Sequence, residues 1–318
     1  MKPCFMFLSV MTLAVFSAAC THLSTAGYYF KSTSRAYIDK ARTYRIDEEP
    51  VSQAQRMSVR PETWNRRNVE VPLPDGNVLR GIAIMRRGSR ANAIYFGGDG
   101  ELAQVATTRI TQLGEKYNIN VIFVDYRGCG ASSGLPAIKN MPDDALRVFD
   151  STSRLRGSIP TIVIGYSMGS IPATYLAAHR PVQGLVLMAP MSGFEDKSMY
   201  PLSRKISVLP WYLTPFAPFV KIKPGFEVLK NSEPVYQILR VAAPLLLIHG
   251  EADQVIPVSC GIKIHELARG NKMALFIPGL GHDELSLMDY PGASFMTRFM
   301  DEYIGPAPVN DDGAFEGY

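Results

Sequence analysis

A stretch of ten residues, Thr161 to Ser170, constrains this chain more than any other part of its sequence. Its first four residues are β-branched, which favours a strand buried within a sheet. A G-x-S-x-G motif centred on Ser167 follows, and the next residues have a helical composition. A strand, a sharp turn with a serine at its tip and a helix form a nucleophile elbow. The stretch therefore predicts that Ser167 is a nucleophile, although the five-residue motif without its flanks would be weak evidence.

The first twenty residues predict export. A positive start at Lys2, an apolar run over 5–16 and small residues before Cys20 are typical of a secretory signal. The cysteine resembles that of a bacterial lipobox, which implies that Cys20 is lipidated, although Ser17 stands where that family usually has Leu. Ordinary cleavage after Ala19 is the alternative. We expect a membrane-anchored lipoprotein facing the periplasm or cell exterior, or otherwise a soluble periplasmic or secreted protein.

Composition excludes several other classes of protein. The chain has 318 residues, of which 47% are hydrophobic and 19% charged, as expected for one large globular domain. The net charge is only +4 with scattered Lys and Arg, so we expect no nucleic-acid partner. No C-x-x-C or H-E-x-x-H motif occurs, so we expect no metal and no cofactor. Of the four cysteines, Cys4 belongs to the expected signal and Cys20 to the expected anchor. The two internal ones, Cys129 and Cys260, do not form a disulfide framework by count or spacing.

We predict four segments along the chain and one insertion. These are a signal peptide over 1–19, an N-terminal tether or arm over 20–66, an α/β domain over 67–305 and a frayed tail over 306–318. The arm carries aromatic and basic residues, and it either packs on the domain or faces the membrane. Residues 191–235 are rich in proline and aromatic residues, which indicates a lid between two strands.

The domain alternates strands and helices, which predicts a mostly parallel sheet covered by helices on both faces. Its start, over 68–87, reads as an antiparallel hairpin around a Pro-Asp-Gly turn. Ligands then bind beyond the carboxyl ends of the strands. The further strands are expected at 93–96, 120–126, 161–164, 182–188, 244–249 and 274–278, and the helices at 101–117, 141–155, 170–180, 258–268 and 286–304.

A base and an acid can be found at later strand ends. Asp253 follows the strand over 244–249, and His282 follows the strand over 274–278. The order serine, aspartate, histidine is the one expected for this fold. Such a histidine takes the serine proton, and the aspartate fixes its tautomer and stabilises the imidazolium. Glu251 is the alternative acid.

The other site residues are predicted less directly. Backbone N–H groups stabilise the oxyanion of such reactions. We expect one from Met168, after the nucleophile, and another from Asp99 or Gly98 in a glycine-rich loop. His249 is expected to be a structural neighbour of the acid, and Cys129 to be a packing residue.

Four motifs carry a family resemblance: G-Y-S-M-G, D-Y-R-G-C-G-A-S-S-G, H-G-E-A-D-Q-V-I-P and G-x-G-H. With them the chain resembles the α/β-hydrolase superfamily over about 68–304, nearest to its Bem46-like and serine-aminopeptidase-like group. The resemblance implies an α/β-hydrolase fold and a hydrolase with the three residues above. The chain differs at Gly97-Gly98, where that group usually has His-Gly and where the histidine is supportive.

We therefore expect a serine hydrolase that cleaves carboxylic esters through an acyl-enzyme. The aromatic lid favours a small-molecule ester with a hydrophobic acyl group. A serine peptidase or amidase, or an acyltransferase, is the alternative on the same three residues. A catalytically silent, membrane-tethered interaction protein is an alternative from another class.

Overall fold

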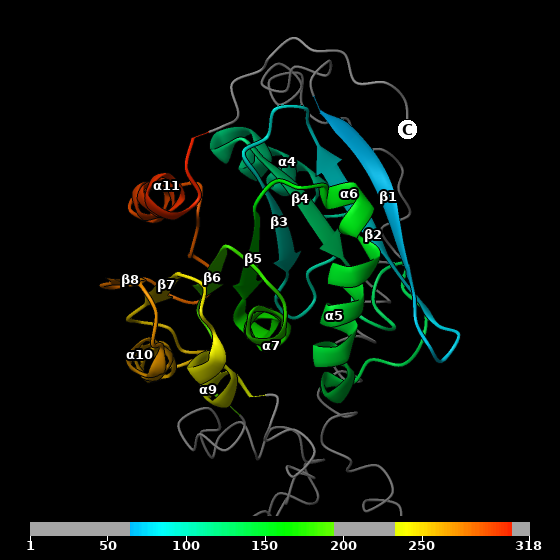
Figure 1. Cartoon of the computed structure of the whole chain (residues 1–318). Coiled ribbons are helices and arrows are strands. Elements are labelled where there is room, and N and C mark those ends of the chain that lie inside the picture. Colours follow the sequence, from blue (N-terminus) through cyan, green and yellow to red (C-terminus); the bar gives the residue numbers. More distant parts are fainter. Residues whose placement is uncertain (1–63, 194–232, 307–318) are drawn as a thin grey trace, which may run out of the picture.

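The computed structural model describes residues 64–193 and 233–306, which Figure 1 draws in colour. The predicted signal, most of the arm, most of the lid and nearly all of the tail lie outside these residues. The expectations for those segments, including lipidation of Cys20, stay predictions. Within the described ranges, no helix is long and apolar enough to cross a membrane.

The described residues form one sheet of eight strands: β1 (Asn65–Pro72), β2 (Val78–Met85), β3 (Ala91–Phe96), β4 (Ile119–Val124), β5 (Thr161–Tyr166), β6 (Gly184–Met188), β7 (Leu245–Gly250) and β8 (Lys272–Ile277). Their order in the sheet is β1-β2-β4-β3-β5-β6-β7-β8. The pairs β1–β2 and β2–β4 are antiparallel, and the remaining pairs are parallel. The mostly parallel sheet with an antiparallel hairpin at its edge is thus confirmed.

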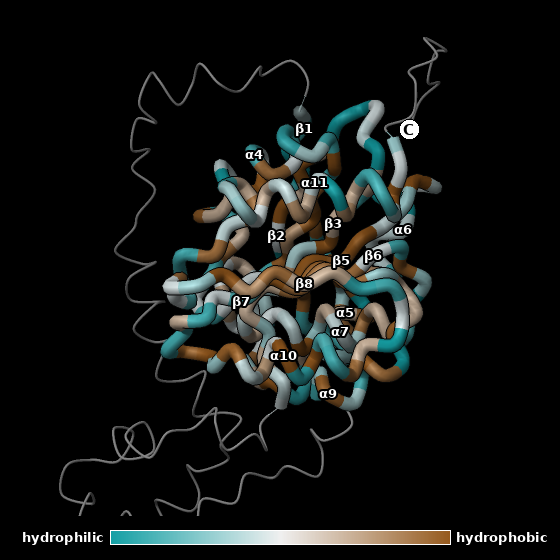
Figure 2. Tube along the Cα trace, turned by 90° about the vertical axis from the view of Figure 1, so that its left-hand side faces the viewer, coloured by the Kyte–Doolittle hydropathy of each residue, from teal (hydrophilic) through white to brown (hydrophobic). Residues whose placement is uncertain are grey.

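Helices cover both faces of this sheet. They are α4 (Thr107–Tyr117), α5 (Met141–Ser151), α6 (Ser153–Arg156), α7 (Ser170–His179), α9 (Pro234–Gln237), α10 (Val258–Leu267) and α11 (Gly292–Tyr303), with short 3₁₀ turns η1 (Ile138–Asn140), η2 (Ser167–Gly169) and η7 (Ile238–Arg240). In Figure 2, α4 and α11 lie above the sheet, whereas α5, α7, α9 and α10 lie below it.

The two helical layers explain why the central strands are buried and mostly apolar, with Asn92 and Asn120 as polar exceptions in β3 and β4. β3, β4 and β6 are buried along their whole length. Successive side chains of a strand point to opposite faces. Ile94 and Phe96 therefore join the core that includes α5 and α7, and Tyr95 joins the core that includes α4 and α11. This arrangement leaves the carboxyl ends of the parallel strands as the edge where polar groups can gather.

One helix begins later than the sequence predicted. The expected helix over 101–117 is helical only from Thr107. The amide of Ala103 donates instead to the buried Asp125 side chain, with N and Oδ1 2.7 Å apart. This bond to another loop keeps the segment before α4 as a turn next to the glycine-rich loop.

Two other predicted helices are shorter than expected. The helix over 141–155 divides into α5 and α6 at Thr152, whose hydroxyl donates to the Val148 carbonyl 2.7 Å away. A threonine that bonds backward in this way competes with regular helix geometry. The helix over 286–304 starts only after Pro291, at Gly292.

Candidate active site

Ser167 lies on a strained turn that runs from β5 through η2 into α7. Its φ is +54°, a left-handed value that costs a non-glycine residue about 1–3 kcal/mol. A Cβ on Gly165 would lie 2.6 Å from the Cβ of Ala173, and one on Gly169 would lie 2.1 Å from the carbonyl oxygen of Phe96. Both distances are shorter than atomic contact allows, so the turn needs glycine on each side of the serine.

The structure brings the three predicted residues into one hydrogen-bonded chain. The Nε2 atom of His282 lies 2.9 Å from Oγ of Ser167, and its Nδ1 atom lies 2.6 Å from Oδ2 of Asp253. All three residues are buried. They meet because β5, β7 and β8 run parallel and end at the same edge of the sheet. This geometry fits a nucleophile, a general base and an acid that orients the base.

The Asp253 carboxylate is held by its own loop. Its Oδ1 atom accepts the amides of Val255 at 2.7 Å and Ile256 at 2.8 Å. Burial has the largest influence on its pKa and acts to raise it. Hydrogen bonds from His249, His282 and Ile256 together outweigh burial and hold the pKa of Asp253 well below its usual range. An ionised Asp253 accepts the Nδ1 proton of His282, which leaves Nε2 free to accept the serine proton.

The alternative acid and the second histidine lie elsewhere. Glu251 is exposed, and its amide continues the sheet by donating to the Ile277 carbonyl. His249 is completely buried, and its Nε2 atom lies 2.9 Å from the Ile256 carbonyl oxygen. Asp253 is therefore the carboxylate that contacts the base, and His249 is its neighbour, as the sequence predicted.

The glycine-rich loop after β3 lies against the serine, since a Cβ on Gly98 would come within 3.4 Å of the Ser167 Cβ. The amide of Gly98, however, donates to Oε2 of Glu101 at 3.0 Å. This contact corrects the expectation that Gly98 supplies an oxyanion donor, because a carboxylate of the same loop already accepts its proton. The expectation that Met168 and Asp99 supply oxyanion donors stays a prediction.

Sequence reasoning missed two tyrosines that support the site. The ring of Tyr166 stacks on His282 with centroids 5.4 Å apart, and its hydroxyl donates to the His282 carbonyl at 3.1 Å. The hydroxyl of Tyr126 donates to the Gly97 carbonyl at 2.8 Å. Both tyrosines lie inside motifs that the sequence singled out, so their positions were visible although their contacts were not.

Cys129 is half-buried and packs against a small cluster that includes Met168. Burial, followed by the nearby charges of Asp125 and Asp99, raises the pKa of its thiol to about 12. A thiol that stays protonated is a poor nucleophile, which agrees with the predicted packing role. In the described part of the chain, no three His, Cys, Asp or Glu side chains gather in a way that could hold a metal ion.

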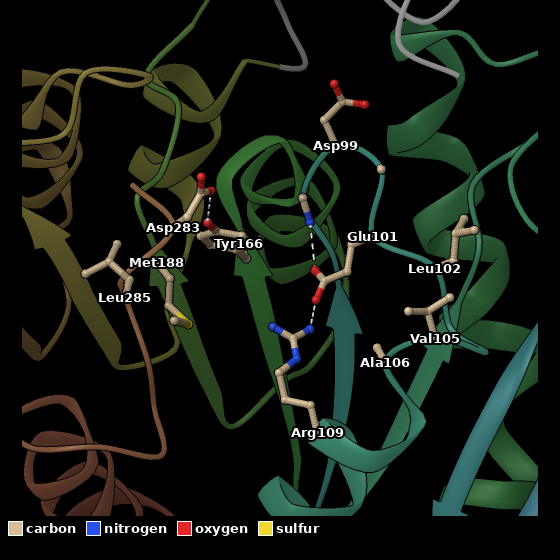
Figure 3. A pocket seen from close by; sticks show the side chains of 12 residues that line it. Asp99, Glu101, Leu102, Val105, Ala106, Arg109, Tyr166, Met188, Asp283 and Leu285 are labelled. Atoms are coloured by element: carbon tan, nitrogen blue, oxygen red, sulfur yellow. Dashed lines mark hydrogen bonds and ion pairs between the residues drawn. The ribbon is translucent and has the colours of Figure 1, made fainter. Parts of the chain in front are cut away.

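A pocket of about 430 Å³ opens beside the glycine-rich loop. Figure 3 shows Tyr166 and Asp283 on one side of it and the Glu101–Arg109 ion pair facing them. None of Ser167, His282 and Asp253 lines the pocket, but two of its lining residues, Gly98 and Tyr166, lie next to Ser167. Its apolar lining is Leu102, Val105, Ala106, Met188 and Leu285.

Comparison with known proteins shows the fold and a family match over part of the chain. A model of the family described as Hydrolase_4, "Serine aminopeptidase, S33", matches residues 89–235. The solved structure of the esterase Pf2001 from Pyrococcus furiosus matches with a TM-score of 0.57 at 20% identity, over 76% of this chain and 94% of that one. The chain has the α/β-hydrolase fold, and part of it is similar to proteins of that superfamily. The predicted α/β-hydrolase fold is therefore confirmed.

Curated α/β hydrolases are similar over much of the described domain. The chain is 29% identical over 216 residues to human protein ABHD12B, which covers 64% of this chain and 58% of that protein. It is 31% identical over 203 residues to the Caenorhabditis elegans α/β hydrolase domain-containing protein aho-3, covering 63% and 52% respectively. The chain thus spans little more than half the length of these relatives. The Bem46-like and lipoprotein resemblances stay predictions.

Proposed function

We propose that this chain is a serine hydrolase that cleaves carboxylic esters through an acyl-enzyme. One observation carries the proposal: a continuous hydrogen-bonded chain joins Ser167, His282 and Asp253 at a strained elbow. Strain of this kind persists where surrounding structure enforces it, and it is concentrated at functional sites. The fold of solved esterases such as Pf2001 agrees with this function but does not specify a substrate.

In the proposed reaction, Oγ of Ser167 attacks the ester carbonyl carbon while Nε2 of His282 takes the hydroxyl proton. Asp253, whose ionised carboxylate accepts the amides of Val255 and Ile256, stabilises the imidazolium. The electron pair of the carbonyl moves to its oxygen, which accepts the N–H groups of Met168 and Asp99. His282 then protonates the departing alkoxide as the carbon–oxygen bond breaks. Water repeats the sequence on the acyl-enzyme and releases the acid.

The pocket supports a hydrophobic substrate. Its apolar side chains come from 102–106 on one side, and from Met188 at the end of β6 and Leu285 after β8 on the other. A cleft of this size with a few polar groups is typical of small-molecule sites. An acyl or alkyl group bound there would place its carbonyl near Ser167.

An amidase or peptidase activity is the nearest alternative, because the description of the matching family names a serine aminopeptidase. Amides and esters pass through the same tetrahedral intermediate, so the three residues do not separate them. An acyltransferase would differ in the acceptor of the acyl group. A catalytically silent interaction protein would not require the hydrogen bonds that join Ser167, His282 and Asp253.

Labelling with a fluorophosphonate probe tests the serine-enzyme proposal. The wild-type protein should label at Ser167, and Ser167→Ala should not label. Ser153→Ala, which removes an exposed hydroxyl on α6, is the matched control and should label fully. Absence of wild-type labelling, or equal labelling of Ser167→Ala, would contradict the proposal and favour the silent protein.

A substrate panel then separates the enzyme classes. We expect p-nitrophenyl esters of increasing acyl length to be cleaved faster than aminoacyl-anilides. Faster anilide cleavage would assign a peptidase or amidase, and product formation only with an added alcohol would assign an acyltransferase.

We also propose that the protein is exported and anchored to a membrane through Cys20. The proposal depends on the sequence before residue 64. Fractionation should find the wild type with membranes and Cys20→Ser in the soluble fraction. Unchanged partitioning of Cys20→Ser would exclude the lipid anchor.

A further inference from the structure

We propose that Glu101 is the positioning residue of the oxyanion loop, and that its carboxylate takes the place of a side chain missing at Gly97. The proposal rests on the proposed function, because it explains how the loop is held for that reaction. Glu101 lies at the start of the turn before α4, and Figure 3 shows its side chain between the loop and Arg109.

Space at Gly97 is the first observation. A Cβ on this residue would lie 2.6 Å from Oε2 of Glu101 and 2.8 Å from the ring of Phe123. The carboxylate of Glu101 therefore occupies the volume into which a side chain at position 97 would point. The chain departs from the resembled group at this residue, and the structure fills the vacated space from four residues further along.

The bonds to the loop are the second observation. Oε2 of Glu101 accepts the amide of Gly98 at 3.0 Å, while the hydroxyl of Tyr126 donates to the Gly97 carbonyl at 2.8 Å. The N–H and the C=O of the peptide unit that joins Gly97 and Gly98 are thus both hydrogen-bonded to side chains. The two bonds fix the plane of the Gly97–Gly98 peptide, from which the loop continues to the amide of Asp99.

The carboxylate is itself held in place. The hydroxyl of Tyr95 donates to Glu101 at 3.1 Å, and the Arg109 guanidinium forms an ion pair with it. Arg109 also donates to the Tyr95 hydroxyl at 3.1 Å and lies over its ring. Glu101 is only 17% exposed, so these contacts satisfy a largely buried charge. Fixed rotamers of this kind are what a preorganised site needs.

The loop position matters because Gly98 lies against the nucleophile. A Cβ added to Gly98 would lie 3.4 Å from the Cβ of Ser167. A shift of the loop changes the distance between the oxyanion donor and the reacting carbonyl. Oxyanion stabilisation acts in the transition state, so a displaced donor lowers kcat with little change in KM.

Three single variants, one double variant and a control test this role. Glu101→Ala should lower kcat about 10- to 100-fold on a p-nitrophenyl ester, with KM within about threefold of wild type. Glu101→Gln keeps an oxygen acceptor for Gly98 and should lose less than about tenfold. Arg109→Met should lower kcat by a few-fold in the wild type and have no further effect in Glu101→Ala, since Arg109 acts through Glu101. Glu70→Ala, which breaks a surface pair with Arg80, is the matched control.

Amide hydrogen exchange at Gly98 provides a readout that does not depend on turnover. Exchange should accelerate at least about tenfold in Glu101→Ala, stay near wild type in Glu101→Gln, and be unchanged in Glu70→Ala. Unchanged Gly98 exchange and kcat in Glu101→Ala would overturn the proposal, as would a rise in KM at constant kcat. If the wild type neither labels nor turns over any substrate, the proposed function fails, and Gly98 exchange alone then decides whether Glu101 holds the loop.

Discussion

Nε2 of His249 lies 3.4 Å from Oδ2 of Asp253, the same oxygen that contacts His282 at 2.6 Å. Two imidazoles thus converge on one carboxylate oxygen. The Nε2 atom of His249 also faces the Ile256 carbonyl, whereas its Nδ1 atom has no hydrogen-bond partner. A proton on Nε2 can be shared between the carbonyl and the carboxylate. His249 therefore steadies the residue that orients the base.

Replacement of this histidine should lower activity through Asp253. We expect His249→Phe to lower kcat/KM about 10- to 100-fold, the effect of losing a hydrogen bond to a charged group. His249→Gln, which keeps an N–H donor, should lose less. Steady-state kinetics on a p-nitrophenyl ester measures both, with His265→Phe on α10 as the control. Full activity of His249→Phe would show that His249 contributes packing alone and does not help to position Asp253.

Gly169 should be required for stability as well as for the elbow. Because a Cβ here meets the Phe96 carbonyl oxygen at 2.1 Å, Gly169→Ala should cost about 1–3 kcal/mol or more in the free energy of unfolding. Urea denaturation measures this change. At Gly270 the nearest atom to a new Cβ is 3.3 Å away, so Gly270→Ala is the matched control and should cost less. Equal losses in the two variants would refute the steric explanation.

Asp125 should make stability depend on pH. Burial, the largest influence, raises its pKa from 3.8 to about 6, although the amides of Ala103 and Ala131 act to lower it. Between these two values the folded protein binds more protons than the unfolded chain. The contribution of Asp125 is therefore fully present below about pH 4 and is lost as pH rises through about 6, a change of about 3 kcal/mol.

Urea denaturation at several pH values, for wild type and Asp125→Asn, isolates this contribution. The variant cannot ionise, so its stability relative to wild type should increase from pH 4 to pH 7. Parallel stability profiles for the two proteins would show that the carboxylate is not titrating in this window.

Cys129 should resist modification while the protein is folded. With its thiol pKa raised to about 12, only a small fraction is thiolate at pH 8. We expect iodoacetamide to modify Cys129 at least about 100-fold more slowly in the native protein than in urea, as followed by peptide mass spectrometry. Rapid native modification would indicate an accessible thiolate and reopen a role for this cysteine beside the site.

The sequence predicted most of the fold because its signals are local. Apolar β-branched runs gave the buried strands, and all six predicted parallel strands are present within a few residues of their expected positions. Helix ends were predicted less well. The start of α4 depends on Asp125, and the end of α5 on a Thr152 hydroxyl, so side-chain bonds decided where each helix stopped or began.

The sequence by itself determined the elbow and the order of serine, aspartate and histidine. Glycines around Ser167 and polar residues at strand ends are properties of short segments. Backbone sterics restrict where such residues occur, so these features can be predicted from the sequence. Only the tertiary structure decided which donors and acceptors are already paired. Glu101 accepts the Gly98 amide, and Tyr126 donates to the Gly97 carbonyl. Two histidines approach one carboxylate oxygen of Asp253. Such pairing depends on how side chains from separate elements approach within about 3 Å, which the periodicity of a single segment does not specify.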